Sequence, residues 1–356
     1  MGYHIFKLNY YCRRMIILEN VLPVIPYNKV FIHCWYNSFA SIVTINDSYQ
    51  AWIISNNVDF VFNPKCTRNL FNWEYSPLYC RRNDDIIKEL KNILNIKFIK
   101  TDTDIVDLAI ECLKNGKYLF AKFDRFYQQG HLDYYKYHNY HFNLIYGYGD
   151  NSDFYLLSDW KRQDYLDSFK IDCKSFNTSI IKASQYQPDV VEFNNNLAII
   201  EKKQGSFLDY KFNIKRIYLN NLSLLNGQEK NDEVNGIQAI KHLYDNLDVF
   251  AFDMKNYKKF SSPFYVLAQN EKRNILLMDY LYQNKYISKK CYIIAIELYE
   301  TLKENWEIIS LMFMKYNHCL TDSIVTRIKQ RLIKIYDHEL KVCELLEQNL
   351  RSVRNG

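Results

Sequence analysis

Apolar residues recur at helical spacing in three segments of the N-terminal half, residues 34–46, 84–95 and 104–116. Such spacing places the apolar side chains on one face of a helix. The second segment opens with acidic residues, which suit the positive end of a helix. Gly116 stands where a glycine ends a helix. We therefore predict a helix in each segment.

Short apolar runs follow, with the length and residue types of β-strands. "KYLFAKFD" (117–124) predicts a strand. "HFNLIYGY" (141–148) and "FYLLSDW" (154–160) are separated by the turn-rich "GDNSD", so they predict a hairpin. Residues 165–224 contain further strand-like runs, "DVVEF", "LAIIEK" and "IKRIYL".

From about residue 236 to 350 the pattern is mostly helical, broken at Pro263 and by a turn near 284–289. The change of character places a domain boundary near 230–236. We predict an α+β domain over residues 1–235 and an α-helical domain over residues 236–356.

Composition narrows the class of protein. Apolar residues make up 48% of the chain and charged residues 24%, as in a globular protein. A net charge of +6 without a dense basic tract does not favour nucleic-acid binding. No apolar run of about 18 residues or signal-peptide pattern is present, so we expect no membrane partner. Nine scattered cysteines without a C-x-x-C pair indicate reduced thiols and a cytoplasmic location.

One cysteine stands at the head of a predicted helix, in "KVFIHCWYNSFASIVTIND" (29–47). The N-terminus of a helix lowers the pKa of a thiol and makes it a nucleophile. Cys34 is therefore a candidate nucleophile. Buried cysteines also serve only in packing, and Cys34 alone does not separate the two roles.

The predicted hairpin supplies candidate partners for that thiol. With its turn at 149–153, paired positions sum to about 300–302, which sets His141 opposite Asp159 or one diagonal step away. A carboxylate beside an imidazole fixes its tautomer and stabilises its charged form, as in a nucleophilic triad. A plain ion pair is the alternative, and His138 with His141 also forms H-x-x-H, a weak metal pattern. We expect His131, in a polar loop, to be solvated.

The "HC" at the helix start and "FDRFYQQGHLDYYKYHNYHFNLIYGYGDNSDFYLLSD" together resemble a known family. It is the butirosin-biosynthesis type of acyltransferase, related to double-glycine-leader peptidases and to an amide-forming cysteine-protease homologue of closthioamide biosynthesis. The resemblance spans about residues 20–165 and implies a papain-like fold, with an N-terminal helix packed on an antiparallel sheet. It implies Cys34 as nucleophile, His141 as base and Asp159 as orienting acid.

The same resemblance implies an oxyanion donor, Asn28, six residues before Cys34. Asp124 and His138 match positions that recur in the family motif. The sequence departs from that motif in "YGYGD", which leaves a role for Asp150 open, and in "SDW", where Asp-Pro is common.

These features imply an acyltransferase of natural-product or nonribosomal peptide biosynthesis. Its partners would be an acyl or peptidyl carrier protein, which presents a phosphopantetheine thioester, and an amine acceptor that takes the acyl group as an amide. No bound cofactor is expected. Basic residues of the helical domain (Lys329, Arg331 and Lys334) are candidates for contact with an acidic carrier. A papain-like cysteine peptidase and a non-catalytic binding protein of the same fold are the alternatives.

Overall fold

The computed structural model describes residues 20–30, 34–45, 51, 53–54, 58–62, 78–82, 90–91, 93–99, 104–149, 152–162, 165–185, 197–203, 212–230, 233–254, 261–319 and 321–351. The chain forms two compact units. Unit 1 comprises residues 1–49 and 87–209, and unit 2 comprises residues 50–86 and 210–356. The division differs from the predicted boundary near 230–236, because residues 50–86 and 210–235 group with the C-terminal helices.

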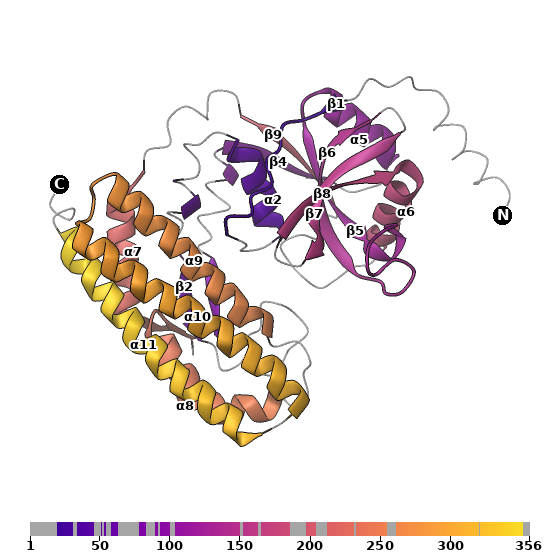
Figure 1. Ribbon diagram of the computed structural model, residues 1–356. Helices are drawn as coiled ribbons and strands as arrows, with labels where there is room; N and C mark the ends of the chain where they lie inside the picture. Colours follow the sequence, from indigo (N-terminus) through magenta and orange to yellow (C-terminus); the bar gives the residue numbers. More distant parts are fainter. Residues whose placement is uncertain are drawn as a thin grey trace. The chain divides into compact units, whose positions relative to one another are not determined.

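An antiparallel sheet forms the centre of unit 1 (Figure 1). Its order is β4-β9-β5-β6-β7-β8, and β1 pairs with β6. The strands are β1 (Asn20–Val21), β4 (Leu94–Ile99), β5 (Tyr118–Asp124), β6 (Tyr140–Tyr148), β7 (Asp153–Arg162), β8 (Tyr165–Asp172) and β9 (Leu197–Lys202).

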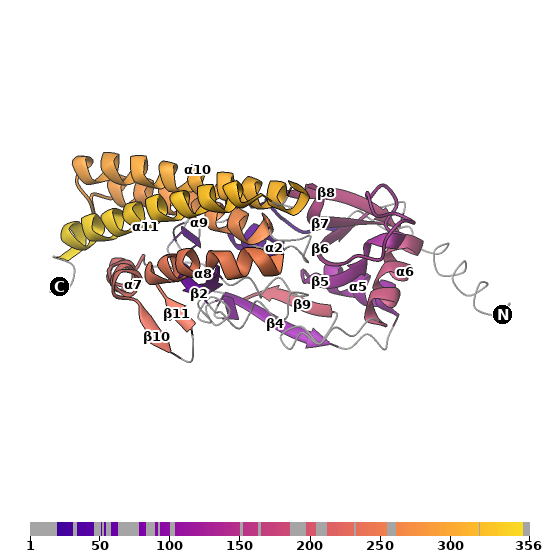
Figure 2. The same ribbon diagram turned by 90° about the horizontal axis from the view of Figure 1, so that it is seen from below.

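Helices cover both faces of this sheet. Helix α2 (Cys34–Val43) lies on one side, and α5 (Ile105–Lys114) and α6 (Cys173–Ser184) lie on the other (Figures 1 and 2). On the α2 side the ring of Phe39 packs on Phe120 of β5 at 5.1 Å between centroids. On the opposite side Phe123 of β5 packs on Phe176 of α6 at 5.6 Å. Neighbouring positions of β5 thus serve opposite layers, as the period-two geometry of a strand requires.

Residues at both ends of helix α5 determine where the helix begins and ends. Asp104 caps the first turn, where its side chain accepts from Val106 N at 3.1 Å. At the other end Gly116 has φ +72°, a left-handed conformation that a residue with a side chain adopts only at a cost. The predicted helix over 104–116 is therefore confirmed.

The predicted hairpin is also present, with the expected register. In the β6–β7 pair, Leu144 faces Leu157 and Ile145 faces Leu156, so paired positions sum to 301. The register then shifts by one residue, and Gly147 faces Tyr155. A second shift lies between Ser158 and Arg162 in the pairing of β7 with β8, where the regular alternation of β7 ends.

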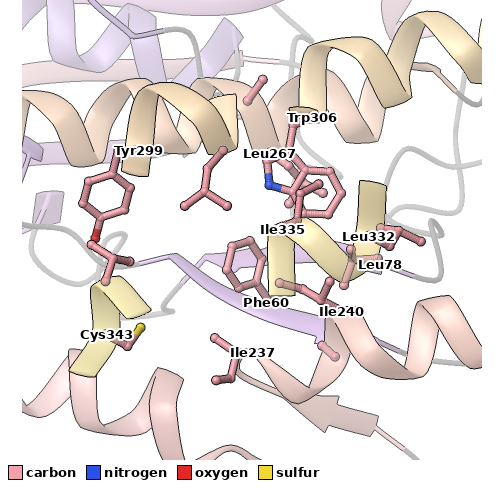
Figure 3. Close-up of a cluster of buried hydrophobic side chains, with 14 of the residues drawn as sticks. Phe60, Leu78, Ile237, Ile240, Leu267, Tyr299, Trp306, Leu332, Ile335 and Cys343 are labelled. Carbon is pink, nitrogen blue, oxygen red and sulfur yellow. The ribbon is translucent and has the colours of Figure 1, made fainter. Parts of the chain in front are cut away.

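Unit 2 combines a small antiparallel sheet with long helices. The sheet has the order β10-β11-β2-β3, from β2 (Val58–Phe62), β3 (Leu78–Arg82), β10 (Gln228–Lys230) and β11 (Glu233–Asn235). The helices are α7 (Ile214–Asn226), α8 (Gln238–Met254), α9 (Ser261–Gln283), α10 (Lys289–Cys319) and α11 (Asp322–Leu350). Both layers share one core, in which Phe60 of β2 and Leu78 of β3 lie with Trp306 of α10 (Figure 3).

Other predicted elements had mixed outcomes. "LAIIEK" is strand β9, but "IKRIYL" (214–219) begins helix α7, so its assignment as a strand was wrong. Residues 173–184, for which the sequence analysis named no element, form helix α6. Most of the helix predicted over 84–95 lies outside the described residues, and residues 94–95 begin strand β4 instead. The strand predicted at 189–193 also lies outside the described residues.

Pro263, expected as a break, lies in the first turn of α9, where a proline is tolerated. The turn expected near 284–289 does separate α9 from α10. Among the helices that the structure describes, none combines the length and apolar character of a membrane span.

Candidate functional site

Cys34 is the first residue of α2, and its side chain is buried. Polar side chains tie this helix to the segment before it. Asn37 donates to the carbonyls of Tyr27 (2.8 Å) and Val30 (2.7 Å). The Ser41 hydroxyl accepts from Tyr27 N at 2.9 Å. These bonds fold residues 27–30 against the first turns of α2 and so hold the start of the helix in place.

Asn28 belongs to that segment and joins it to the sheet. Its amide nitrogen donates to Leu166 O (3.0 Å), and its amide oxygen accepts from Leu166 N (2.8 Å). Leu166 is the second residue of β8, so the segment before Cys34 is anchored where β8 begins. One amide N–H of Asn28 is not used in this pairing, and its role as an oxyanion donor stays a prediction.

His141 and Asp159 are in contact, at the end of the sheet where β6 begins and β7 ends. His141 Nδ1 lies 3.2 Å from Asp159 Oδ1 and 3.4 Å from Ser158 Oγ. The Asp159 side chain is only 7% exposed and that of His141 20%. The carboxylate therefore restricts the imidazole from the Nδ1 side, which leaves Nε2 as the nitrogen for proton transfer.

Arg125 completes this cluster, and sequence reasoning missed it. Its guanidinium is buried after the end of β5 and donates to Asp159 Oδ1 at 2.5 Å and to Asp159 O at 3.2 Å. Ser158 Oγ also donates to Asp159 Oδ1, at 3.1 Å. Asp159 thus has a cation, a hydroxyl and an imidazole around one carboxylate. The only sequence signal for Arg125 was its position beside Asp124 in the quoted motif.

Charge and burial set the protonation of the cluster. Burial lowers the pKa of His141 well below its usual value, and the charge of Arg125 lowers it further. Burial also raises the pKa of Asp159, and the Arg125 charge opposes that rise. A histidine with a lowered pKa is neutral near pH 7, so His141 can accept a proton there.

Cys34 and His141 lie on different faces of the sheet. His141 pairs with Phe123, and paired residues of an antiparallel sheet share a face, here the one that α6 covers. Phe142 points the other way and stacks on Phe120, on the side of α2. His141 Nδ1 contacts Asp159 and Ser158.

A second histidine–carboxylate pair lies at the same end of the sheet. His138 Nδ1 is 2.7 Å from Asp124 Oδ2, and Asp124 is the last residue of β5. His138 also stacks on Phe126 at 4.4 Å. The two histidines of H-x-x-H therefore contact different carboxylates. Asp124 and His138 had matched the family motif, but we had not predicted that they would pair with each other.

His131 lies beside this cluster and is not solvated as we expected. Its side chain is 6% exposed and packs edge-on against Trp160 at 5.0 Å. Burial and the charge of Arg125 lower its pKa. His131 of the loop 128–139 thus packs on Trp160 beside the cluster, which the polar sequence of the loop did not indicate.

The basic residues considered for carrier docking are in part used within unit 2. Lys329 forms an ion pair with Asp248, and Arg331 donates to Asn305 Oδ1 at 2.7 Å. Lys334 is exposed.

Asp150 lies outside the described residues. Comparison with protein-family models and with curated proteins finds no match for this chain.

Proposed function

We propose that this protein is a cysteine-dependent acyltransferase of papain-like fold that forms amides from carrier-bound acyl thioesters. The observation that carries the proposal is the buried contact of His141 with Asp159, at 3.2 Å. A neutral, oriented imidazole is the group that a thiol nucleophile needs as its base. The hydrogen bonds of Asn28 to Leu166 also support the proposal, because they hold the segment before Cys34 at the start of β8, the end of the sheet where β6 begins.

The reaction would proceed in two balanced steps. His141 accepts the proton of Cys34, and the thiolate attacks the thioester carbonyl, which releases the phosphopantetheine thiol with that proton. An amine then attacks the acyl-enzyme, His141 accepts the amine proton, and the Cys34 thiol leaves. The product is an amide. The first step exchanges one thioester for another, so the energy of activation comes from the carrier-bound donor.

Helix α2 and His141 occupy opposite faces of the sheet. For proton transfer between them, Cys34 Sγ and His141 Nε2 must therefore meet around the end of the sheet where β6 begins. His138, paired with Asp124 at the same end, is a second candidate for the base. Variants of the two histidines distinguish these assignments.

The test uses the full chain and two probes, a carrier protein loaded with an acyl-phosphopantetheine and the matching N-acetylcysteamine thioester. Intact mass spectrometry should detect an acyl adduct on the wild type, and an added primary amine should convert it to an amide. Cys34→Ala should form no adduct. Cys173→Ala is the matched control, because Cys173 is also the first residue of a helix, and it should behave as the wild type.

His141→Ala should lower the rate of acylation by about 100-fold or more, and His138→Ala should leave it within a few-fold. The reverse order would move the base to His138. Free acid as the only product would instead indicate the cysteine peptidase. An acyl adduct that persists in Cys34→Ala would overturn the proposed mechanism. If the wild type forms no adduct with either probe, the mechanism is also overturned, and the non-catalytic alternative is favoured. Carrier binding and a cytoplasmic location belong to the same proposal.

A further inference from the structure

A partly open cavity of about 30 Å³ lies in the core of unit 2, and Phe60, Tyr299 and Cys343, which Figure 3 labels, belong to its lining. Burial of a polar group is costly unless a partner replaces the lost water. This lining is nevertheless rich in polar side chains, so it calls for an explanation. They include those of Asn220, Asn221, Asn270, Arg273, Asn274 and Glu339.

These polar side chains are partly paired with one another and with Glu271, which lies next to the cavity but is not part of its lining. Asn274 donates to Glu271 Oε2 at 2.9 Å and accepts from Arg273 at 3.0 Å. The carboxyl groups of Glu271 and Glu339 share a hydrogen bond. The pairing therefore holds the wall of the cavity in shape, but it does not use every polar atom.

Unused polar atoms of both kinds remain in the lining. Within the described part of the chain, Asn270 Oδ1, Glu339 Oε1 and Asn220 Nδ2 are buried and have no hydrogen-bond partner. The orientation of the Asn270 amide is fixed, because its nitrogen donates to the carboxyl group of Glu271. The guanidinium of Arg273 also lines the cavity and carries further N–H donors. The cavity thus offers two acceptors and at least one donor to an occupant.

The charges around the cavity favour a neutral occupant. Burial raises the pKa of Glu339 well above its usual value, so this carboxyl group keeps its proton at neutral pH. Burial raises the pKa of Glu271 to about 7, and the charge that Glu271 carries above that pH is offset by Arg273. Tyr299 and Cys343 have pKa values raised by burial and stay neutral. No ion is needed for balance.

We propose that this cavity binds a small neutral molecule through a primary carboxamide group. The two N–H bonds of a carboxamide complement Asn270 Oδ1 and Glu339 Oε1, and its carbonyl oxygen accepts from Asn220 Nδ2. The volume holds about two atoms of the size of a water oxygen, which the amide nitrogen and oxygen supply. Phe60 and Leu277 give an apolar wall for a short carbon chain that extends towards the mouth. The site lies within unit 2 and does not depend on the proposed acyl transfer.

Saturation-transfer NMR on the full chain with propionamide tests this inference. We expect saturable binding with a Kd on the order of 1 mM, because so small a ligand gains limited binding free energy. N,N-dimethylpropionamide keeps the carbonyl oxygen and loses both N–H donors, so it should bind at least about tenfold more weakly. Propionate has a charge and no donor, and 1-propanol has a single donor, so both should also bind more weakly than propionamide.

Asn220→Leu keeps the size of the side chain and removes the donor to the carbonyl oxygen, so propionamide should bind about tenfold more weakly. Ser223→Ala, at an exposed position of the same helix, is the matched control and should bind as the wild type. Absence of saturable binding, which would leave the cavity to water, would overturn the inference. Equal binding of any of the three comparison compounds, or wild-type binding by folded Asn220→Leu, would also overturn it. The comparison of the four compounds on the wild type decides the matter if Asn220→Leu does not fold.

Discussion

Arg125 is the residue that changes the chemistry expected from His141 and Asp159. A histidine beside a carboxylate alone would have a raised pKa, because the negative charge favours the imidazolium. In this protein burial lowers the pKa of His141, and the charge of the buried guanidinium, which lies 2.5 Å from Asp159, lowers it further. The imidazole is thereby kept ready to accept a proton at neutral and mildly acidic pH.

This electrostatic arrangement predicts the effect of Arg125→Met on the pH–rate profile of acylation. Without the guanidinium, the charge of Arg125 no longer offsets that of the Asp159 carboxylate, so the His141–Asp159 pair holds one proton more tightly. The acid limb of the profile should move upward by about one pH unit or more.

Lys117→Met is the control for that variant. Lys117 pairs with Glu201 at 3.6 Å, a contact of two partly exposed side chains, so its loss should leave the acid limb in place. An acid limb that is the same in Arg125→Met and in the wild type would show that Arg125 does not act on the catalytic base.

At the scale of secondary-structure elements, the junction of β11 with α8 is a tight turn at Gly236. Gly236 lies between them with φ +74°, and its N–H donates to Phe60 O of β2 at 2.8 Å. The next residue, Ile237, donates to Leu224 O of α7 at 3.0 Å. One tight turn therefore holds a strand and two helices together. A Cβ on Gly236 would lie 2.4 Å from Leu224 O, a distance that the backbone cannot accommodate without moving.

Gly236→Ala should therefore lower the free energy of unfolding by roughly 3 kcal/mol or more, from left-handed strain and the clash together. Gly116→Ala is the matched comparison. Gly116 has φ +72°, but a Cβ there would meet no atom within 4 Å, so only the strain of about 1–2 kcal/mol remains. Denaturant unfolding followed by circular dichroism measures both values. If both variants lose the same free energy of unfolding, the backbone near Gly236 accommodates the added Cβ and the clash with Leu224 O does not destabilise the protein.

At the scale of the whole molecule, the two units are not consecutive in the sequence. Strands β2 and β3 precede the rest of unit 2 by more than a hundred residues, yet Phe60, Phe62 and Leu78 belong to the core of its helices. Strand β11 pairs with β2, which joins the two separated parts in one sheet. Removal of β2 and β3 should therefore destabilise the C-terminal helices, although these helices are continuous in the sequence.

A fragment of residues 236–356, the helical domain that the sequence predicted, should not fold alone. It lacks β2, β3, β10, β11 and α7, so a large apolar surface of α8–α11 would be exposed to water. We expect aggregation or a non-cooperative thermal transition by calorimetry. The full chain is the control. A fragment that unfolds cooperatively, with a Tm near that of the full chain, would show that the core of α8–α11 is sufficient by itself.

Local structure was largely determined by the sequence. The helix over 104–116 follows from its apolar spacing and Gly116, and the β6–β7 register follows from a short turn and the period of two. Both depend on residues that are near neighbours in the chain, where geometry leaves few choices. The start of a helix at Cys34 and the contact of His141 with Asp159 were predictable for the same reason.

Only the tertiary structure decided the remaining features. Residues 214–219 are strand-like in composition but helical, because Ile217 and Tyr218 fit the core of unit 2. The pairing of Arg125 with Asp159 joins residues that are 34 positions apart in the chain, with β6 between them. The opposite faces of α2 and His141 depend on which side of the sheet each helix covers. Such contacts depend on packing between residues that are far apart in the sequence. A local pattern of residues does not determine the free energy of that packing.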